Sequence, residues 1–450
     1  MSQRILTTGS TPSSNFPFVS YGGLGRVLEQ HNNDLVESPP GNIVFMNTNT
    51  PSTTIICGVQ GSGKSHSVGV IVENSLISMR ELGSLPEPLS VTVFHLSAAQ
   101  GGMHLPCESA FIQKSALGVT DLEVPVYVLV SPSNLVNMRE SYAKTGATVR
   151  PFYLSTKDLN CSRMLSLMHV EEGDKIPLYM EVVQQILRSM GSDAFDYRVF
   201  KREIDAKKMK EFSQQQRMPL DLRFQLLEAM LLECQKVKAK TTDSVKEYFK
   251  PGRVTIIDLT DPFINASAAA ALFDIALSLY LEAKIATGKL LVLDEAHKVN
   301  IIDTGFLLTF QYLTNKVSDP FVNSMFSVIR QQRHLGIRTI VSTQEPTVVP
   351  EDMIGLCSTV ICHRFSSPLW WKHLKRLVPL DDESSKVDWF DRISRLKTGE
   401  CIVFCPLALT AIETGHGSSG PTNLGRGCML VKVRRKVTET SGQSVLSVRV

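Results

Sequence analysis

A glycine-rich run at residues 58–65 carries residue types that can bind a phosphate chain. The run reads Gly-Val-Gln-Gly-Ser-Gly-Lys-Ser and matches G-x-x-x-x-G-K-[ST] at every specified position. Its glycines let the loop turn N–H groups around an anion, Lys64 would reach the β- and γ-phosphates, and the Ser65 hydroxyl would ligate Mg²⁺. We therefore predict that a nucleotide is bound by the following residues: Gly58, Val59, Gln60, Gly61, Ser62, Gly63, Lys64, Ser65 and His66.

Two acids at the end of an apolar run supply the second part of this chemistry. Residues 290–293 are Leu-Leu-Val-Leu, and Asp294 and Glu295 follow directly. A buried strand of this kind delivers the acids at its carboxyl end, where open α/β sheets bind ligands. We predict that Asp294 holds Mg²⁺ through its water shell, opposite Ser65. Glu295 is predicted to orient and polarise the attacking water.

A third strand-like run, residues 336–343, is followed by Gln344. Because this run comes after the acidic strand in the chain, we predict that the Gln344 side chain lies between Glu295 and the γ-phosphate. The nearby cations are Arg330, Arg333, Arg338 and Arg364. One of them is a candidate to act on a neighbouring subunit's nucleotide, as arginine fingers do, and a surface or structural role is the alternative for each.

Apolar periodicity predicts the elements that hold these residues in place. Residues 53–57 read as a buried strand, and apolar residues at 68, 71, 72 and 76 mark one face of the helix that follows. Further strand-like runs occupy residues 90–96, 124–130, 254–259 and 290–293. Strands that alternate with helices indicate an α/β fold with a mostly parallel central sheet flanked by helices.

The chain divides into three predicted regions. They are a partly disordered N-terminal arm, a P-loop nucleotide-binding domain that contains a helical insertion, and a glycine-rich loop with a C-terminal β-hairpin: residues 1–40, 41–410 (insertion about 160–250) and 411–450. The arms of the predicted hairpin are residues 429–436 and 444–450.

The 450-residue chain has ordinary globular composition, 43% hydrophobic and 20% charged, with a formal net charge of +3. A large basic field is therefore absent, and contact with nucleic acid would depend on local patches. No apolar run approaches the roughly 18 residues that suggest a membrane span, and the N-terminus lacks the apolar segment of a secretory signal. We therefore expect an intracellular protein, cytoplasmic or nuclear, without a membrane span.

The nine cysteines are odd in number and include no C-x-x-C pair, which favours a reducing compartment over a disulfide scaffold. A zinc site is one interpretation of the group Cys357, Cys362, His363, Cys401 and Cys405. Their spacing fits no standard ligand pattern, and most of them lie in strand-like apolar runs. Buried strand positions are therefore the favoured interpretation.

Two stretches outside the predicted site combine cations with residues that suit nucleic acid. Residues 201–218 are polar and Lys-rich. A solvated helical surface is the favoured interpretation, and a surface facing nucleic acid is the alternative. Residues 366–376 interleave Trp370 and Trp371 with cations, a pattern that can stack bases and hold phosphates. An amphipathic helix packed on the core is the favoured interpretation there.

The order of these motifs resembles the HerA/FtsK superfamily of P-loop ATPases, most closely its HerA-like branch. The resemblance covers residues 40–410, from the glycine loop through LLVLDEAHK and IRQQRHLGIRTIVSTQEP to VICHRF and an L-x-x-G-E phrase at Leu396. It implies a RecA-like (ASCE) core, ATP as the nucleotide, and a hexameric ring that moves DNA or, in some members, protein. It also implies that Gln344 is the sensor and that Arg364 or Arg333 supplies the catalytic or trans-acting arginine.

The leading functional prediction is a Mg²⁺-dependent ATPase motor, a ring-forming DNA translocase or helicase-like pump built from identical subunits. A motor that moves protein is the first alternative, and a nucleotide-binding switch or scaffold with little hydrolysis is the second. Glu295 argues against the switch, because a protein that does not hydrolyse ATP has no chemical need for a carboxylate there. A metabolic kinase is disfavoured because no compact acceptor site or lid pattern stands out.

Overall fold

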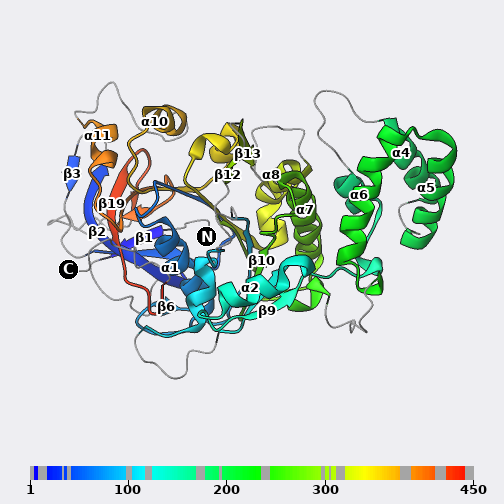
Figure 1. Cartoon of the computed structure of the whole chain (residues 1–450). Coiled ribbons are helices and arrows are strands. Elements are labelled where there is room, and N and C mark those ends of the chain that lie inside the picture. Colours follow the sequence, from blue (N-terminus) through cyan, green and yellow to red (C-terminus); the bar gives the residue numbers. More distant parts are fainter. Residues whose placement is uncertain are drawn as a thin grey trace.

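A large, mostly parallel β-sheet runs through the centre of the protein and helices cover it (Figure 1). The computed structural model describes residues 5–8, 18–32, 35–37, 42–97, 104–116, 124–168, 178–191, 195–234, 244–294, 299–303, 306–310, 320–375, 387–410 and 422–440. Eight neighbouring strands are parallel, and in spatial order they are β9 (Thr148–Pro151), β8 (Val126–Val130), β10 (Arg253–Asp258), β7 (Ser90–His95), β11 (Lys289–Asp294), β14 (Ile337–Thr343), β5 (Thr53–Cys57) and β15 (Thr359–Cys362). The predicted α/β class is confirmed.

These strands read as continuous apolar runs because both faces of the parallel sheet are covered. Every residue of β5, β7 and β14 is buried. Alternate side chains enter two separate hydrophobic clusters. Ile55 packs with α7 (Ala266–Glu282) and α8 (Pro320–Leu335), whereas Ile56 packs with α1 (Lys64–Leu76) on the other face. Helices therefore cover both faces of the sheet. Because its eight neighbouring strands are parallel, their carboxyl ends lie at one edge.

The remaining helices are shorter or lie at the ends of the sheet. They are α2 (Leu135–Tyr142), α3 (Cys161–Met168), α4 (Leu178–Met190), α5 (Tyr197–Glu211), α6 (Gln214–Met230), α9 (Glu351–Gly355), α10 (Pro368–Lys375) and α11 (Trp389–Ser394), with a 3₁₀ helix η1 (Glu108–Gln113). None of the helices in the described ranges has the length and apolar character required to span a bilayer.

Beyond β15 the sheet continues with strands that pair mostly antiparallel. In order they are β16 (Glu400–Phe404), β19 (Cys428–Val433), β2 (Tyr21–Asn32), β4 (Ile43–Asn47) and β1 (Ile5–Thr8). The short strands β3 (Leu35–Glu37) and β6 (Gly83–Ser84) pair with β2, and β17 (Leu409–Thr410) pairs in parallel with β1 and antiparallel with β18 (Thr422–Asn423). A separate hairpin contains β12 (Val299–Asp303) and β13 (Phe306–Phe310). β2 places Leu24 and Val27 in the core. The predicted arm over residues 1–40 is therefore wrong for β2, which is a core strand held between β19 and β4.

The predicted C-terminal hairpin also needs correction. Its first arm contains β19, but one edge of β19 pairs with β16 and the other pairs with β2. A strand has two hydrogen-bonding edges, so β19 has none left for the predicted second arm. That arm, residues 444–450, lies outside the described residues.

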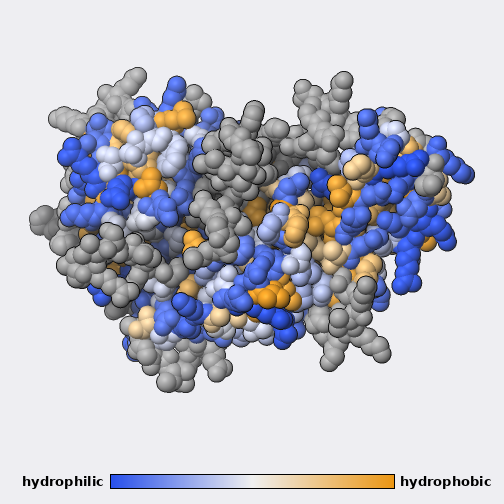
Figure 2. Space-filling model, viewed as in Figure 1, coloured by the Kyte–Doolittle hydropathy of each residue, from blue (hydrophilic) through white to orange (hydrophobic). Residues whose placement is uncertain are grey.

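The segment predicted as a helical insertion holds α3 to α6, and α4 to α6 extend past the end of the sheet (Figure 1). Its helices pack through buried aromatic and aliphatic side chains, among them Tyr179, Val183, Phe200, Leu220 and Phe224. The outer face of this region is largely hydrophilic (Figure 2). The insertion therefore continues the hydrophobic core that lies between the sheet and α7 and α8, and it has a solvated outer surface.

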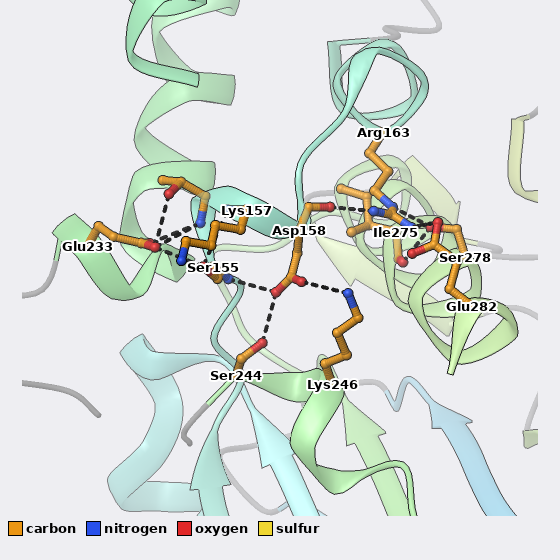
Figure 3. A network of polar contacts seen from close by, with 11 residues as sticks. Ser155, Lys157, Asp158, Arg163, Glu233, Ser244, Lys246, Ile275, Ser278 and Glu282 are labelled. Atoms are coloured by element: carbon orange, nitrogen blue, oxygen red, sulfur yellow. Dashed lines mark hydrogen bonds and ion pairs between the residues drawn. The ribbon is translucent and has the colours of Figure 1, made fainter. Parts of the chain in front are cut away.

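A polar network ties both ends of the insertion to each other and to α7 (Figure 3). The Asp158 carboxylate accepts hydrogen bonds from the Ser244 hydroxyl at 2.9 Å and from Lys246 Nζ at 3.2 Å. Arg163, a few residues further on, donates to the backbone carbonyl oxygen of Asp158 and pairs with Glu282 on α7. The segments where the chain enters and leaves the insertion are thus joined to each other and to α7 at one place.

Residues 434–440, which we call the C-terminal strap, lie across α1. The Glu73 carboxylate on α1 is fully buried and pairs with Arg434 at 2.6 Å. It also accepts hydrogen bonds from the backbone N–H groups of Val437 and Thr438, each at 2.9 Å. The strap reaches a second element through Lys436, whose ammonium pairs with Glu108 of η1 at 2.7 Å. It therefore links α1 to η1.

Candidate functional site

The glycine loop, residues 58–63, joins β5 to α1, and its shape depends on glycine. Gly58, Gly61 and Gly63 have φ values of 152°, 73° and 117°, which other residues rarely adopt. A Cβ on Gly58 would lie 2.7 Å from Cβ of His363, so a larger residue would displace a buried side chain. Backbones of this kind allow successive N–H groups to converge on an anion.

Helix α1 begins at Lys64, directly after the loop, so its positive dipole end faces the same place. The N-cap residue is Gly63, which has no side chain to occupy the N–H groups of the first turn. Lys64 is buried, with 4% of its surface exposed, and Ser65 and His66 are half-buried. His66, predicted to contact the nucleotide, has its Nε2 atom 2.7 Å from the carbonyl oxygen of Arg434 in the strap.

The loop rests on the ends of two neighbouring strands. The N–H of Val59 donates to the carbonyl oxygen of Arg364, just after β15, at 2.9 Å. The N–H of Gly399, just before β16, donates to the carbonyl oxygen of Ser62 at 3.1 Å. The Ser62 hydroxyl closes the loop on itself by donating to the carbonyl oxygen of Val59 at 2.6 Å. The L-x-x-G-E phrase therefore contacts the loop through its glycine.

His363 lies beneath the loop, and both of its ring nitrogens have partners. Nδ1 lies 2.9 Å from the carbonyl oxygen of Glu400, which only accepts, so Nδ1 carries a proton. Nε2 lies 2.9 Å from the Ser67 hydroxyl on α1. Burial lowers the pKa of His363 to about 4. The ring is therefore neutral near pH 7, and Nε2 accepts the hydrogen bond from Ser67.

Asp258, His95 and Asp294 end three adjacent strands at one level of the sheet. The register pairs Asp258 with His95 and pairs His95 with Asp294. All three residues are buried, and Nδ1 of His95 lies 3.2 Å from Oδ2 of Asp294. Asp294 thus lies at the carboxyl edge of the sheet. Glu295 lies outside the described residues, and its role stays a prediction.

A buried network surrounds these two acids. The Cys107 thiol donates to Oδ2 of Asp294 at 3.5 Å, and the Tyr142 hydroxyl donates to Oδ2 of Asp258 at 2.7 Å. Burial alone would lower the pKa of His95, but the charge of Asp258 and the bond to Asp294 raise it well above its ordinary value. Donor atoms of His95, Cys107 and Asp294 lie within 4.8 Å of one another, and their hydrogen bonds account for this closeness.

Strand β14 lies between β11 and β5, so its end separates the acidic edge from the glycine loop. Gln344 follows β14 directly and is half-buried. The register pairs Thr343 with Cys57, the residue before the loop. Neighbouring strands are about 4.8 Å apart, so Asp294 lies roughly 10 Å from the start of the loop. Gln344 is therefore placed between the two halves of the site, and its contact with the second acid stays a prediction.

The two arginines predicted to act on nucleotide lie at opposite ends of the strands, Arg364 at the carboxyl ends and Arg333 at the amino ends. Arg364 is exposed, and its backbone contacts the glycine loop. Arg333 is exposed near the C-terminal end of α8. Its neighbour Gln332 accepts a hydrogen bond at 2.9 Å from Thr53, the first residue of β5. The length of β5, roughly 16 Å, therefore separates Arg333 from the loop of its own chain.

The other two arginines and the candidate zinc group have structural explanations. Arg338 is buried and donates to the backbone carbonyl oxygens of Thr48 and Asn49. Arg330 lies over the Phe326 ring at 5.6 Å. No three members of the cysteine–histidine group bring donor atoms together within the part of the chain that the structure describes. Cys362 and Cys401 are buried strand residues, as the favoured interpretation has it, whereas Cys357 is half-buried before β15 and Cys405 follows β16.

The two candidate nucleic-acid surfaces differ in the contacts that their side chains make with the rest of the chain. In the Lys-rich stretch, Lys201 and Lys208 form ion pairs with carboxylates of α6. On α10, Leu374 is buried, and Trp370 and Trp371 are half-buried against the main hydrophobic cluster. The favoured interpretation of α10, an amphipathic helix packed on the core, is confirmed.

Sequence reasoning did not assign His95, Asp258 or His363 to the site. Asp258 lay only within the predicted strand of residues 254–259, and His363 was named only as a zinc candidate. His95 and Asp258 end largely apolar strands, as Asp294 does, and His363 directly follows one. A polar residue at such a strand end is the same signal that identified Asp294. That signal marks the carboxyl edge of the sheet, but it does not tell which strands are neighbours.

No family model and no curated protein matches this chain. Among solved structures, VirB4 of Thermoanaerobacter pseudethanolicus is similar, with a TM-score of 0.48, 10% identity, and coverage of 95% of this chain and 99% of that chain. The bacterial conjugative coupling protein TrwBdeltaN70 has a TM-score of 0.48, 10% identity, and coverage of 96% and 98%. The genome packaging NTPase B204 from Sulfolobus turreted icosahedral virus 2, in complex with ATP-gammaS, has a TM-score of 0.31, 10% identity, and coverage of 79% and 92%.

At 10% identity the likeness concerns the fold alone, and the TM-scores lie below 0.5. The fold class of this chain therefore rests on its own strand order and on the position of the glycine loop.

Proposed function

We propose that this chain is a Mg²⁺-dependent ATPase whose site lies between the glycine loop and the acidic edge. The observation that carries the proposal is the loop, where three positive-φ glycines, the buried Lys64 and the start of α1 meet. Converging N–H groups, a helix dipole and an ammonium all favour negative charge. A triphosphate is the ligand that such a loop suits.

The side chains around the loop divide the work of binding and hydrolysis. Lys64 binds and orients the β- and γ-phosphates, and the Ser65 hydroxyl and the Asp294 carboxylate are oxygen donors of the class that Mg²⁺ prefers. The ion, when bound, neutralises phosphate charge. Glu295 accepts a proton from the attacking water, and Gln344 orients that water.

We further propose that the ATPase is a motor that moves DNA as a homo-oligomeric, hexameric ring. The support is the motif order, which resembles the HerA/FtsK superfamily. The position of Arg333, remote from the loop of its own chain, suits contact with a neighbouring subunit's nucleotide. Arg364, beside the loop of its own chain, suits a role within one subunit.

ATP turnover with and without DNA tests both levels of the proposal. We expect the wild type to hydrolyse ATP and DNA to raise the rate. Glu295→Gln should lower turnover by about 10²–10⁴-fold because it removes the proton acceptor, and Lys64→Ala should abolish nucleotide binding. Lys284→Ala is the matched control, since this exposed lysine follows α7 at the edge of the sheet away from the loop.

Each outcome selects one function. Turnover that ignores DNA would favour a protein-moving motor. Nucleotide binding without turnover in the wild type would favour a switch or scaffold. Absence of nucleotide binding in a folded wild type would overturn the proposed site itself.

A further inference from the structure

We propose that His363 is a positioning residue that fixes the first turn of α1, and with it Lys64 and Ser65, against the sheet. The inference rests on the proposed nucleotide site and deepens it. His363 acts through Ser67 and through the glycine loop rather than on the nucleotide itself.

The residue joins three elements that meet beneath the loop. Its backbone N–H donates to the carbonyl oxygen of Cys57, the last residue of β5, at 2.8 Å. Its ring donates to Glu400 at the start of β16 and accepts from Ser67 on α1. Two strands and one helix are therefore held by a single side chain and its backbone.

The side chain of His363 also fills the space below two glycines of the loop. A Cβ on Gly58 would lie 2.7 Å from Cβ of His363, and a Cβ on Gly63 would lie 3.3 Å from its Cε1. The next residue, Arg364, holds the N–H of Val59 through its carbonyl oxygen. The loop is thus supported from below at both ends and tied at its second residue.

The contact with Ser67 sets the rotation of α1 about its axis. Ser67 is fully buried and lies three residues after Lys64, so both lie on neighbouring positions of one helix face. The first turn is also tied to the strap through His66, and the bond to Ser67 adds a directional contact with the strand ends beneath the loop. A small rotation there would move the Lys64 ammonium and the Ser65 hydroxyl together.

Two amide substitutions distinguish the two hydrogen bonds of the His363 ring, because each keeps one of them. Asparagine at 363 places an amide near the Nδ1 position and keeps the bond to Glu400, whereas glutamine places an acceptor near the Nε2 position and keeps the bond to Ser67. We expect His363→Asn and Ser67→Ala each to raise the dissociation constant of ATP-gammaS roughly tenfold, and His363→Gln to stay within about threefold of wild type. The double variant His363→Asn/Ser67→Ala should bind no worse than either single variant, because both remove one interaction.

Binding is measured on folded protein well below the unfolding temperature, with His31→Asn as the matched control. His31 is another buried histidine, on β2, and its ring contacts Trp389 rather than the loop. Its substitution should lower the unfolding temperature without weakening nucleotide binding. Binding by His363→Asn and Ser67→Ala that equals the wild type would overturn the inference, as would equal weakening by His31→Asn. A folded wild type that binds no nucleotide would instead overturn the proposed function.

Discussion

At the residue scale, the buried imidazole of His363 links stability to pH. Its pKa is about 4 in the folded protein, below the ordinary value of 6.5. Between these values the unfolded chain binds more protons than the folded one, so stability falls as the pH drops through this window and is complete above it. The full effect is about 3 kcal/mol at 1.36 kcal/mol per pH unit.

Urea unfolding of wild type and His363→Asn between pH 4 and 7.5 measures this contribution. We expect the wild type to lose more stability than the variant as the pH falls from 6.5 to 4. Other titrating groups, including His31 with its lowered pKa, are present in both proteins and cancel in the difference. Parallel pH profiles would show that the pKa of His363 is the same in the folded and the unfolded chain, and would contradict the neutral ring assigned to the folded protein.

The buried carboxylate of Glu73 determines what the C-terminal strap contributes at the element scale. Arg434→Ala removes its ionic partner and leaves a charge that water cannot reach. Losing one partner of a buried pair costs about 3–5 kcal/mol of unfolding free energy. We expect chemical denaturation to show a loss of this size.

Arg395→Ala is the control for that measurement, because Arg395 forms an exposed ion pair with Asp391 on α11. Exposed pairs of this kind contribute about 0–1 kcal/mol. Similar losses in the two variants would contradict the prediction. They would mean that the strap's backbone N–H groups alone satisfy Glu73.

The elements around the glycine loop were predictable from sequence because their signals are local. β5, β11 and β14 are apolar runs that end at the residues of interest. The length and the partners of β2 were not predictable, because its glycines resemble those of a loop. They are needed for close approach: a Cβ on Gly22 would lie 2.2 Å from Asn74 of α1, and one on Gly25 would lie 2.2 Å from the carbonyl oxygen of Lys432.

The half of the site beneath the loop escaped prediction for a related reason. His363 touches Ser67 and Glu400, which lie 296 residues before it and 37 residues after it. Neither contact follows from the spacing of residue types along the chain. Only the pairing of β15 with β5 and β16 brings them together.

At the scale of the whole molecule, the opposite positions of Arg333 and Arg364 lead to a mixing experiment. Lys64→Ala subunits keep Arg333 but cannot bind nucleotide, and Arg333→Ala subunits bind nucleotide but lack the arginine. If Arg333 acts on a neighbouring subunit, mixing two inactive proteins should restore part of the ATP turnover. Arg364→Ala subunits should gain nothing from the same mixing, because Arg364 lies beside the loop of its own chain.

Arg330→Ala is the control, since Arg330 is exposed on the same helix and one turn earlier. Its substitution should leave turnover near the wild-type value. Restoration by Arg364→Ala and not by Arg333→Ala would exchange the two assignments. Failure of both mixtures would remove the trans-acting role from the proposed mechanism.

The bond between Glu73 and Arg434 also has a consequence for biosynthesis. The two residues are 361 positions apart in the chain. At about 5–20 residues per second, a ribosome makes the helix of Glu73 roughly 20–70 s before the counter-charge. β2 likewise cannot pair with β19 until β19 has been translated. The helix that follows the glycine loop therefore cannot settle into its final place on the nascent chain, and nucleotide binding should be acquired late, after the strap has been translated.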